Sequence, residues 1–254
     1  MNEGRFVPEM PERLRMRFSI YARLLSHQRK VARARERIAE FIGRTQHPYV
    51  AFSAGKDSAC VLHLVREQAS GTPAVYFDAQ CAYPEVRTLI GRTDNLITFP
   101  ADEPFLETLQ RVGLFAPALE RITMQTTVWG PAARLIARYG FDSVAYGLRA
   151  DESRGRRAHA RRNGAVFQYV SGLWGCQPIW DWTYDDVWAF ILTTHIPYCG
   201  TYDRMWYMPE REQRISYWAG ESNRENGRYV WLKRNYPDLY NELRSRIPEI
   251  SVYA

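Results

Sequence analysis

The chain has 254 residues, of which 46% are hydrophobic and 24% are charged, a composition typical of a globular protein with one large α/β domain or two small ones. No stretch approaches the roughly 18 uninterrupted apolar residues of a membrane-spanning helix, and residues 1–5 lack the features of a secretory signal, so we expect a cytoplasmic protein without a membrane segment. The formal net charge of +6 favours an anionic partner such as a nucleotide or a nucleic acid.

The first predicted elements are helical. Apolar residues recur at three-, four- and seven-residue steps between residues 11 and 45, which predicts one long helix or a helix pair. Strands are expected at four short apolar runs, residues 49–52, 74–77, 95–99 and 143–146. Helical stretches are expected between them, at about 59–65, 102–112 and 127–139. This alternation predicts an α/β fold with a doubly wound, mostly parallel sheet covered on both faces.

The second half of the chain continues this pattern. We expect strands at 167–170 and 177–180, and a helix at about 184–194 with Thr183 as its N-cap. A helical, aromatic-rich segment follows, with Trp206, Trp218 and Trp231. The predicted organisation is therefore an N-terminal helical extension, an α/β domain and a helical C-terminal appendage, over residues 1–45, 46–203 and 204–254.

A glycine-containing loop lies between the first predicted strand and the helix after it. Its residues are Ser53, Ala54, Gly55, Lys56, Asp57 and Ser58. The small residues Ala54 and Gly55 let the backbone turn tightly, so that successive N–H groups at a helix N-terminus can point at one anion. Lys56 adds a positive charge, and it stands out because only three of the 34 basic residues are lysines. Such a tight loop suits pyrophosphate more than a γ-phosphate poised for transfer.

Four segments resemble one family, in the order in which that family carries them. Ser53–Ser58 resembles the Ser-Gly-Gly-Lys-Asp-Ser loop of the PP-loop ATP pyrophosphatase superfamily, in the branch that holds phosphoadenylylsulfate (PAPS) reductases and the sulfate adenylyltransferase small subunit. Residues 78–85, 147–156 and 177–188 resemble later motifs of that branch. Ala54 replaces the first family Gly, which we expect to matter only if the backbone needs a positive φ. The resemblance implies a Rossmann-like fold, called adenine nucleotide alpha hydrolase-like, that binds ATP and Mg²⁺.

The resemblance also implies a set of site residues. The nucleotide and its phosphates would contact Ser53, Ala54, Gly55, Lys56, Asp57, Ser58, Asp78, Gly147, Leu148, Arg149, Ser153 and Arg156. Lys56, Asp57 and Arg149 are the candidate catalytic residues, and Asp57 and Asp78 are the candidate Mg²⁺ ligands, although a helix cap is the alternative for Asp78. Residues 147–162 are expected to form an arginine-rich loop that clamps phosphate or sulfate and stays mobile until the nucleotide binds.

The chemistry implied is attack on the α-phosphate of ATP, which adenylylates an acceptor and releases pyrophosphate. The acceptor would be sulfate, a nucleic-acid group or another group in sulfur metabolism or modification. One alternative is a DNA- or RNA-modifying, phosphorothioation-like ATP pyrophosphatase that acts with partner proteins. The others are a reductase-like protein that binds PAPS or its unphosphorylated form, and a non-catalytic nucleotide-binding module. Reductases of the family carry a C-terminal Glu-Cys-Gly-Leu-His segment, whereas no cysteine follows Cys199 here, which argues against reduction.

Partners and cysteines complete the expectations. The family implies a GTPase, a DNA-binding protein or a sulfur-donor protein as partner, within an oligomer or complex. The four cysteines, Cys60, Cys81, Cys176 and Cys199, have poor spacing for a [4Fe-4S] cluster, so no iron–sulfur site is favoured. The basic residues between Arg13 and Arg37 suit either contact with nucleic acid or a solvated helix face.

Overall fold

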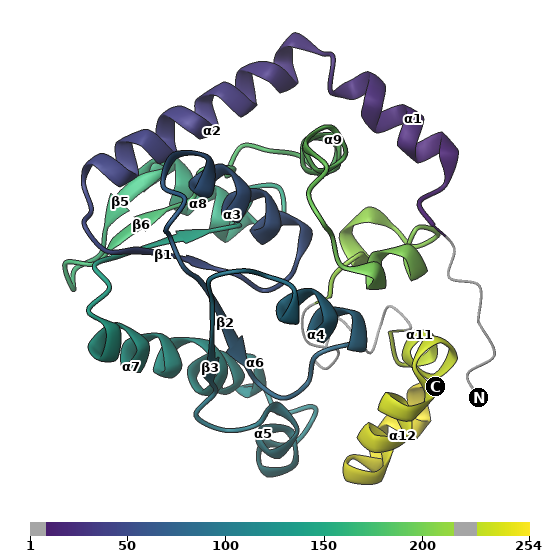
Figure 1. The fold of residues 1–254 in the computed structure, drawn as a ribbon. Coiled ribbons are helices and arrows are strands. Elements are labelled where there is room, and N and C mark those ends of the chain that lie inside the picture. Colours follow the sequence, from purple (N-terminus) through teal and green to yellow (C-terminus); the bar gives the residue numbers. More distant parts are fainter. Residues whose placement is uncertain (1–8, 216–227) are drawn as a thin grey trace. The chain divides into compact units, whose positions relative to one another are not determined.

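The computed structural model describes residues 9–215 and 228–254, and Trp218 lies outside them (Figure 1). The chain divides into two compact units. The first unit contains residues 1–76, 85–97 and 139–214, and the second contains residues 77–84, 98–138 and 215–254. None of the described helices combines the length and the apolar character needed to cross a membrane. The division into segments 1–45, 46–203 and 204–254 stays a prediction.

A six-stranded sheet is the centre of the fold, with the strand order β3-β2-β1-β4-β6-β5. Its strands are β1 (Pro48–Ala51), β2 (Ala74–Asp78), β3 (Leu96–Pro100), β4 (Ser143–Tyr146), β5 (Val166–Gln168) and β6 (Trp174–Cys176). Strand β1 pairs in parallel with both β2 and β4, and Val50 lies opposite Ala74 and Ala145. Only β5 is shown to run antiparallel to its neighbour, β6. The predicted doubly wound, mostly parallel α/β sheet is confirmed.

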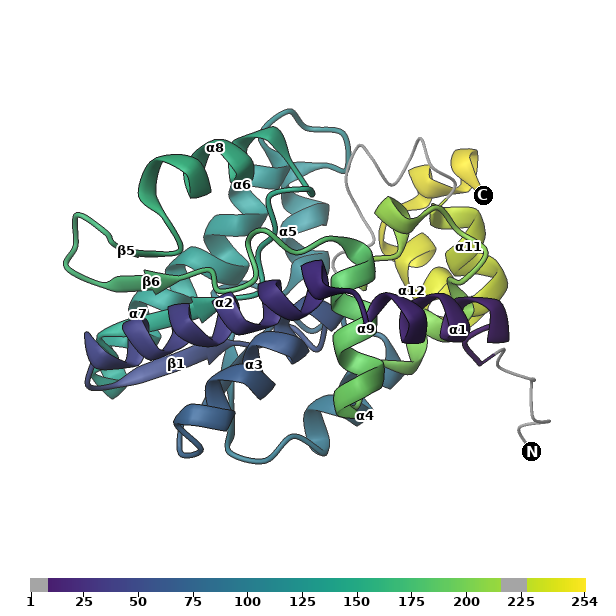
Figure 2. The same ribbon diagram turned by 90° about the horizontal axis from the view of Figure 1, so that it is seen from above.

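Helices of the first unit cover both faces of its strands. They are α1 (Glu12–Tyr21), α2 (Leu25–Gly43), α3 (Lys56–Gln68), α4 (Pro84–Gly91), α8 (Arg154–Asn163) and α9 (Tyr184–Thr194), followed by the 3-10 turns η2 (Gly200–Arg204) and η3 (Glu210–Glu212). The predicted N-terminal helix pair is confirmed as α1 and α2. Phe18 of α1 is fully buried and its ring lies 5.9 Å from that of Tyr184 in α9. Figure 2 shows α2 and α8 on opposite sides of β5 and β6.

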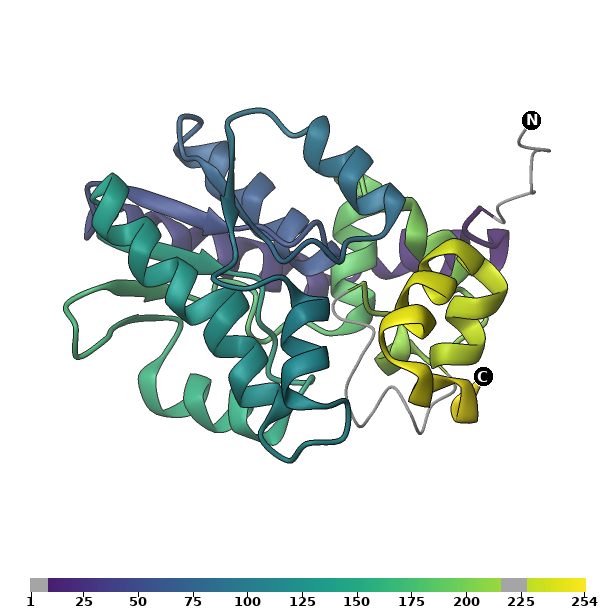
Figure 3. The same cartoon turned by 90° about the horizontal axis from the view of Figure 1, so that it is seen from below.

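The second unit is mainly helical. Its elements are α5 (Phe105–Val112), α6 (Leu119–Met124), a π-helical turn η1 (Gln125–Trp129), α7 (Gly130–Tyr139), α11 (Arg228–Asn235), α12 (Pro237–Arg246) and η4 (Pro248–Tyr253). Helices α11 and α12, yellow in Figure 3, lie side by side. The fully buried ring of Tyr83 lies 4.9 Å from Tyr236 and 5.9 Å from Trp231, which ties these helices to the segment 77–84.

The strand predicted at residues 177–180 is wrong. The last sheet strand is β6, Trp174–Cys176, and the residues after it form turns in which the N–H of Trp180 donates to the carbonyl of Gln177. Pro178 has no N–H to give to a strand ladder, and this explains why the apolar run does not extend the sheet.

The mobile loop predicted at residues 147–162 is also wrong over most of its length, because α8 occupies residues 154–163. Ser153 caps this helix, and its hydroxyl accepts the N–H of Arg156 at 3.1 Å. Arginine and alanine are good helix formers, so a capped run of them forms a helix despite the glycine at 155.

Candidate phosphate-binding site

The loop between β1 and α3 is held in a fixed turn by its own hydroxyl groups. The Ser58 hydroxyl donates to the carbonyl of Gly55 at 2.9 Å and accepts the N–H of Ser53 at 3.2 Å. Ala54 is buried and has a φ of 60°. The backbone therefore does need a positive φ at this position, where the related loops have glycine. A left-handed backbone costs a non-glycine residue about 1–2 kcal/mol. The hydrogen bonds of Ser58 therefore hold a turn whose backbone conformation at Ala54 is unfavourable for alanine.

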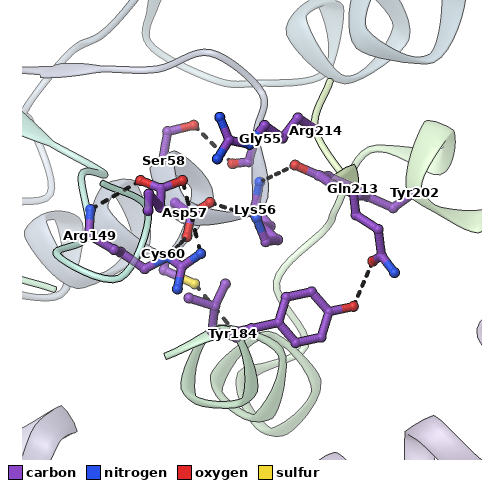
Figure 4. Close-up of polar contacts among 12 residues, drawn as sticks. Gly55, Lys56, Asp57, Ser58, Cys60, Arg149, Tyr184, Tyr202, Gln213 and Arg214 are labelled. Atoms are coloured by element: carbon purple, nitrogen blue, oxygen red, sulfur yellow. Dashed lines mark hydrogen bonds and ion pairs between the residues drawn. The ribbon is translucent and has the colours of Figure 1, made fainter. Parts of the chain in front are cut away.

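Two cations flank one carboxylate at the first turn of α3. The Asp57 carboxylate accepts from Lys56 Nζ at 2.9 Å and from Arg149 Nε at 2.5 Å, as Figure 4 shows. Lys56 and Arg149 are only 4% and 5% exposed. Burial by itself raises the pKa of Asp57, but the charges of Lys56 and Arg149 outweigh it and hold that pKa below its ordinary value. The three groups are thus a charged, buried cluster at a helix N-terminus.

Gly147 explains how Arg149 reaches this cluster. Strand β4 ends at Tyr146, next to β1, and Gly147 follows directly against the start of α3. A Cβ at Gly147 would lie 2.6 Å from the backbone nitrogen of Ser58 and 2.7 Å from the carbonyl carbon of Asp57. Only glycine permits this approach of two backbones. The half-buried Leu148 follows, and Arg149 then projects onto Asp57.

Two arginines of this region, Arg149 and Arg156, are paired with nearby carboxylates. Arg149 Nη1 donates to Asp151 at 2.6 Å, and the backbone N–H of Arg149 donates to Glu152 at 3.3 Å. Arg156 is paired with the same Glu152. Burial raises the pKa of Asp151, the charge of Arg149 opposes this, and the net direction is upward. A bound anion would therefore have to compete with Asp151 and Glu152 for these guanidinium groups.

Three residues far along the chain complete the site and were not predicted. The Tyr202 hydroxyl, from η2, accepts the backbone N–H of Lys56 at 3.2 Å, and the Tyr202 ring lies 5.7 Å from Lys56 Nζ. Next to it the Tyr184 hydroxyl donates to Gln213 Oε1 at 2.6 Å (Figure 4). No local motif marks these residues, since their role depends on the return of the chain to the loop after about 150 residues.

The predicted site residues fall into two groups. In the first group, Gly147 and Arg149 lie directly against Ser58 and Asp57 of the loop. Arg156 is linked to Arg149 through Glu152, and Ser153 caps the helix that carries Arg156. Asp78 ends β2 in the second unit, where its carboxylate accepts the N–H of Gln80 at 2.8 Å, and its role toward the nucleotide stays a prediction.

Both oxygens of Asp57 are engaged by Lys56 and Arg149. Within residues 9–215 and 228–254 no group of three His, Cys, Asp or Glu side chains could hold a metal ion. These residues do not fit an Mg²⁺ site built by the protein alone, and the Mg²⁺ assignments to Asp57 and Asp78 stay predictions.

Comparison with known proteins identifies the family. Residues 47–208 match the model of the phosphoadenosine phosphosulfate reductase domain. Two phosphoadenosine 5'-phosphosulfate reductases of Aliivibrio fischeri are similar to the chain. The reductase of strain ES114 is 26% identical over 196 residues, which are 74% of this chain and 76% of the relative. The reductase of strain MJ11 is 25% identical over 194 residues, with the same coverage.

Among solved structures, a phosphoadenylyl-sulfate reductase from Candida auris in a phosphate complex has a TM-score of 0.53 at 16% identity, covering 76% of this chain and 90% of the other. The FMN adenylyltransferase of Candida glabrata has a TM-score of 0.53 at 15% identity, covering 75% and 66%. These two structures show the fold alone. The family match, which spans more than half of the residues, identifies the chain as a member of the phosphoadenosine phosphosulfate reductase domain family, a family of nucleotide-binding enzymes with the PP-loop fold.

Proposed function

We propose that this enzyme binds ATP with its phosphates at Ser53–Ser58 and transfers the adenylyl group to an anionic acceptor. The observation that carries the proposal is the buried cluster of Lys56, Asp57 and Arg149, fixed at the N-terminus of α3 by the close approach of Gly147. A helix N-terminus with two adjacent cations favours an anion. Asp57 holds both cations in position and stays charged, because its pKa is lowered.

The proposed reaction is a substitution at the α-phosphorus. A lone pair of an acceptor oxygen forms the new bond to phosphorus, and the bond from phosphorus to the oxygen that bridges to the β-phosphate breaks. Pyrophosphate leaves with that electron pair. Lys56 and the loop N–H groups stabilise the charge that develops, while Arg149 exchanges Asp151, and Arg156 exchanges Glu152, for the acceptor. An anionic acceptor has no proton to lose, so no general base is required.

Three of the four cysteines, all of them buried, support this choice over thiol chemistry. Burial raises the pKa of the thiols of Cys60, Cys176 and Cys199, and the thiolate is the nucleophilic form. None of these three thiols is therefore poised to attack a sulfur or phosphorus centre at neutral pH.

A second candidate follows from the names of the sequence relatives, which are phosphoadenosine 5'-phosphosulfate reductases. On this alternative the same site binds phosphoadenylylsulfate. Incubation of the enzyme with phosphoadenylylsulfate and a dithiol reductant would release sulfite if the alternative holds. Release of sulfite without any ATP-dependent pyrophosphate release would favour it over adenylylation.

The Lys56→Met variant tests the proposed function. We expect pyrophosphate release from ATP, measured in turn with sulfate, single-stranded DNA and tRNA as acceptors, to fall by about 100-fold or more, because one preorganised donor is lost. Lys233→Met is the matched control, since it removes the same charge from the second unit. Both variants should unfold cooperatively, which a thermal scan checks. Equal rates in Lys56→Met and the parent enzyme, or no acceptor-dependent release in either, would contradict the proposal.

Tyr202→Phe tests whether the Lys56 N–H binds phosphate. In the parent enzyme ATP must displace the Tyr202 hydroxyl from that N–H. The variant leaves the N–H without this partner, so we expect its free form to lose about 1 kcal/mol of stability and to bind ATP about fivefold more tightly. Tyr198→Phe is the control, because its hydroxyl donates to Asp203 instead. Calorimetric titration gives the affinities, and unchanged or weaker binding by Tyr202→Phe would refute this role.

A further inference from the structure

The Glu152 carboxylate lies between the two arginines that the proposed reaction assigns to the acceptor, Arg149 and Arg156. Its Oε2 accepts the backbone N–H of Arg149 at 3.3 Å and a hydrogen bond from Nη1 of Arg156. Its Oε1 lies 4.0 Å from Nη2 of Arg149. The Glu152 side chain is 15% exposed, so water has little access to these contacts. Donors of both arginines thus converge on an anionic group that the chain itself supplies.

A carboxylate in this position stands where a free oxyanion would bind. Guanidinium groups recognise carboxylates and tetrahedral oxyanions with the same forked geometry, because each offers a pair of negatively charged oxygens. Asp57 and Asp151 are paired with Arg149, but neither is paired with Arg156 in the described part of the chain. The Glu152 carboxylate, which contacts both arginines, therefore marks the place for an oxyanion, and we call this place the oxyanion subsite.

A backbone turn keeps the Glu152 carboxylate next to its donors. The N–H of Glu152 donates to the carbonyl of Arg149 at 3.3 Å, and the N–H of Ala150, inside the turn, donates to the carbonyl of Trp180 at 2.8 Å. Because so short a segment joins the carboxylate to Arg149, the carboxylate competes for the donors at a high effective concentration. A free anion binds only the fraction of molecules in which the carboxylate has left, and its apparent affinity is lowered accordingly.

We propose that Glu152 determines which acceptor binds, because it occupies the oxyanion subsite and yields it only to a doubly charged oxyanion such as sulfate or phosphate. A singly charged anion carries no more charge than the Glu152 carboxylate and lacks its tether to the site. A dianion is attracted about twice as strongly by the two guanidinium groups. The place of this subsite in the reaction rests on the proposed adenylyl transfer, whereas the binding of the anion does not.

Glu152→Gln tests the proposal, because its amide oxygen can still accept the Arg149 N–H while the negative charge is lost. Sulfate, phosphate and nitrate are titrated separately into the full chain without ATP, at constant ionic strength, and binding is read from the rise of the thermal midpoint. We expect sulfate or phosphate, but not nitrate, to stabilise the parent protein, and the tighter of the two identifies the acceptor oxyanion. In Glu152→Gln its apparent dissociation constant should fall about tenfold or more.

Asp151→Asn is the matched control, since it removes the same charge from Arg149 but leaves Glu152 in the oxyanion subsite. The Asp151 side chain is 40% exposed, so its charge is screened and the dissociation constant should change by no more than about threefold. Glu152→Ala, which also removes the charge, takes the place of Glu152→Gln if that variant shows no cooperative transition. Equal tightening in the Asp151 and Glu152 variants would assign the effect to net charge and overturn the proposal.

Three further results would overturn it: an unchanged dissociation constant in Glu152→Gln, equal binding of nitrate and sulfate by the parent protein, or tighter binding of ATP alone. The last result would assign the subsite to the phosphates of the nucleotide. With ATP present, the KM for the anion in pyrophosphate release should fall by the same factor as its dissociation constant. Tighter anion binding without pyrophosphate release would contradict only the adenylyl transfer, whereas pyrophosphate release at an unchanged KM would contradict only this role of Glu152.

Discussion

Asp57→Ala should lower the free energy of unfolding by about 3–5 kcal/mol, because it leaves Lys56 and Arg149 buried side by side without their shared carboxylate. The two cations are 4% and 5% exposed, so water cannot replace Asp57 as their partner. Urea denaturation followed by circular dichroism gives the change. Asp151→Ala is the matched control: it also removes a carboxylate from Arg149, but the Asp151 side chain is 40% exposed and its loss should cost no more than about 1 kcal/mol. Similar losses in the two variants would contradict this account of the cluster.

Asp57→Ala and the parent protein should also differ in how their stability depends on pH. The pKa of Asp57 is lower in the folded chain than its ordinary value of 3.8. The carboxylate therefore contributes its full stabilisation above about pH 4, and this contribution is lost as the pH falls through the folded pKa. Because Asp57→Ala has no such group, its stability should fall less steeply with acid below about pH 4 than that of the parent protein. A steeper fall in the variant would show that Asp57 is not held charged by Lys56 and Arg149.

The strands and the loop are the part of this molecule that local sequence predicts well. The runs at 49–52, 74–77 and 143–146 are short, apolar and followed by polar or glycine residues, and each forms a strand near its predicted position. Strand β6 was missed because it is only three residues long and one of them is glycine, which weakens any strand signal. The spacing of apolar residues predicts elements that are long or strongly apolar. It does not predict a short strand such as β6, which forms because it pairs with its neighbours in the sheet.

Only those site residues that belong to a recognisable sequence motif could be predicted. Gly147 and Arg149 could be assigned to the loop because both belong to a recognisable segment. The contact of Tyr202 with the Lys56 N–H arises from the tertiary fold, since α9 packs against α3 and the chain after α9 brings η2 back to the loop. The pairing of Arg149 with Asp151 was also not expected, because sequence shows the cations but not how many carboxylates the fold places against them.

Gly147→Ala is expected to disrupt the site more directly than any change in charge. The new Cβ would lie 2.6 Å from the nitrogen of Ser58 and 2.7 Å from the carbonyl carbon of Asp57, and both are backbone atoms that cannot rotate away. Either β4 or the start of α3 must shift, which costs about 1–3 kcal/mol or more. Because that shift moves Arg149 away from Asp57, we expect ATP binding, measured by calorimetric titration, to weaken by about tenfold or more.

Gly155→Ala provides the opposite expectation within the same segment. No atom lies within 4 Å of a Cβ at Gly155, which lies in the first turn of α8. Alanine there should stabilise the protein by about 0.5–1 kcal/mol, because glycine weakens a helix through its conformational freedom. If Gly147→Ala were as stable as the parent protein or more stable, the close packing of Gly147 against α3 would not be what fixes Arg149. A loss of stability in Gly147→Ala and a gain in Gly155→Ala, with ATP binding weakened only in Gly147→Ala, would show that the buried cations are positioned by the absence of a side chain at residue 147.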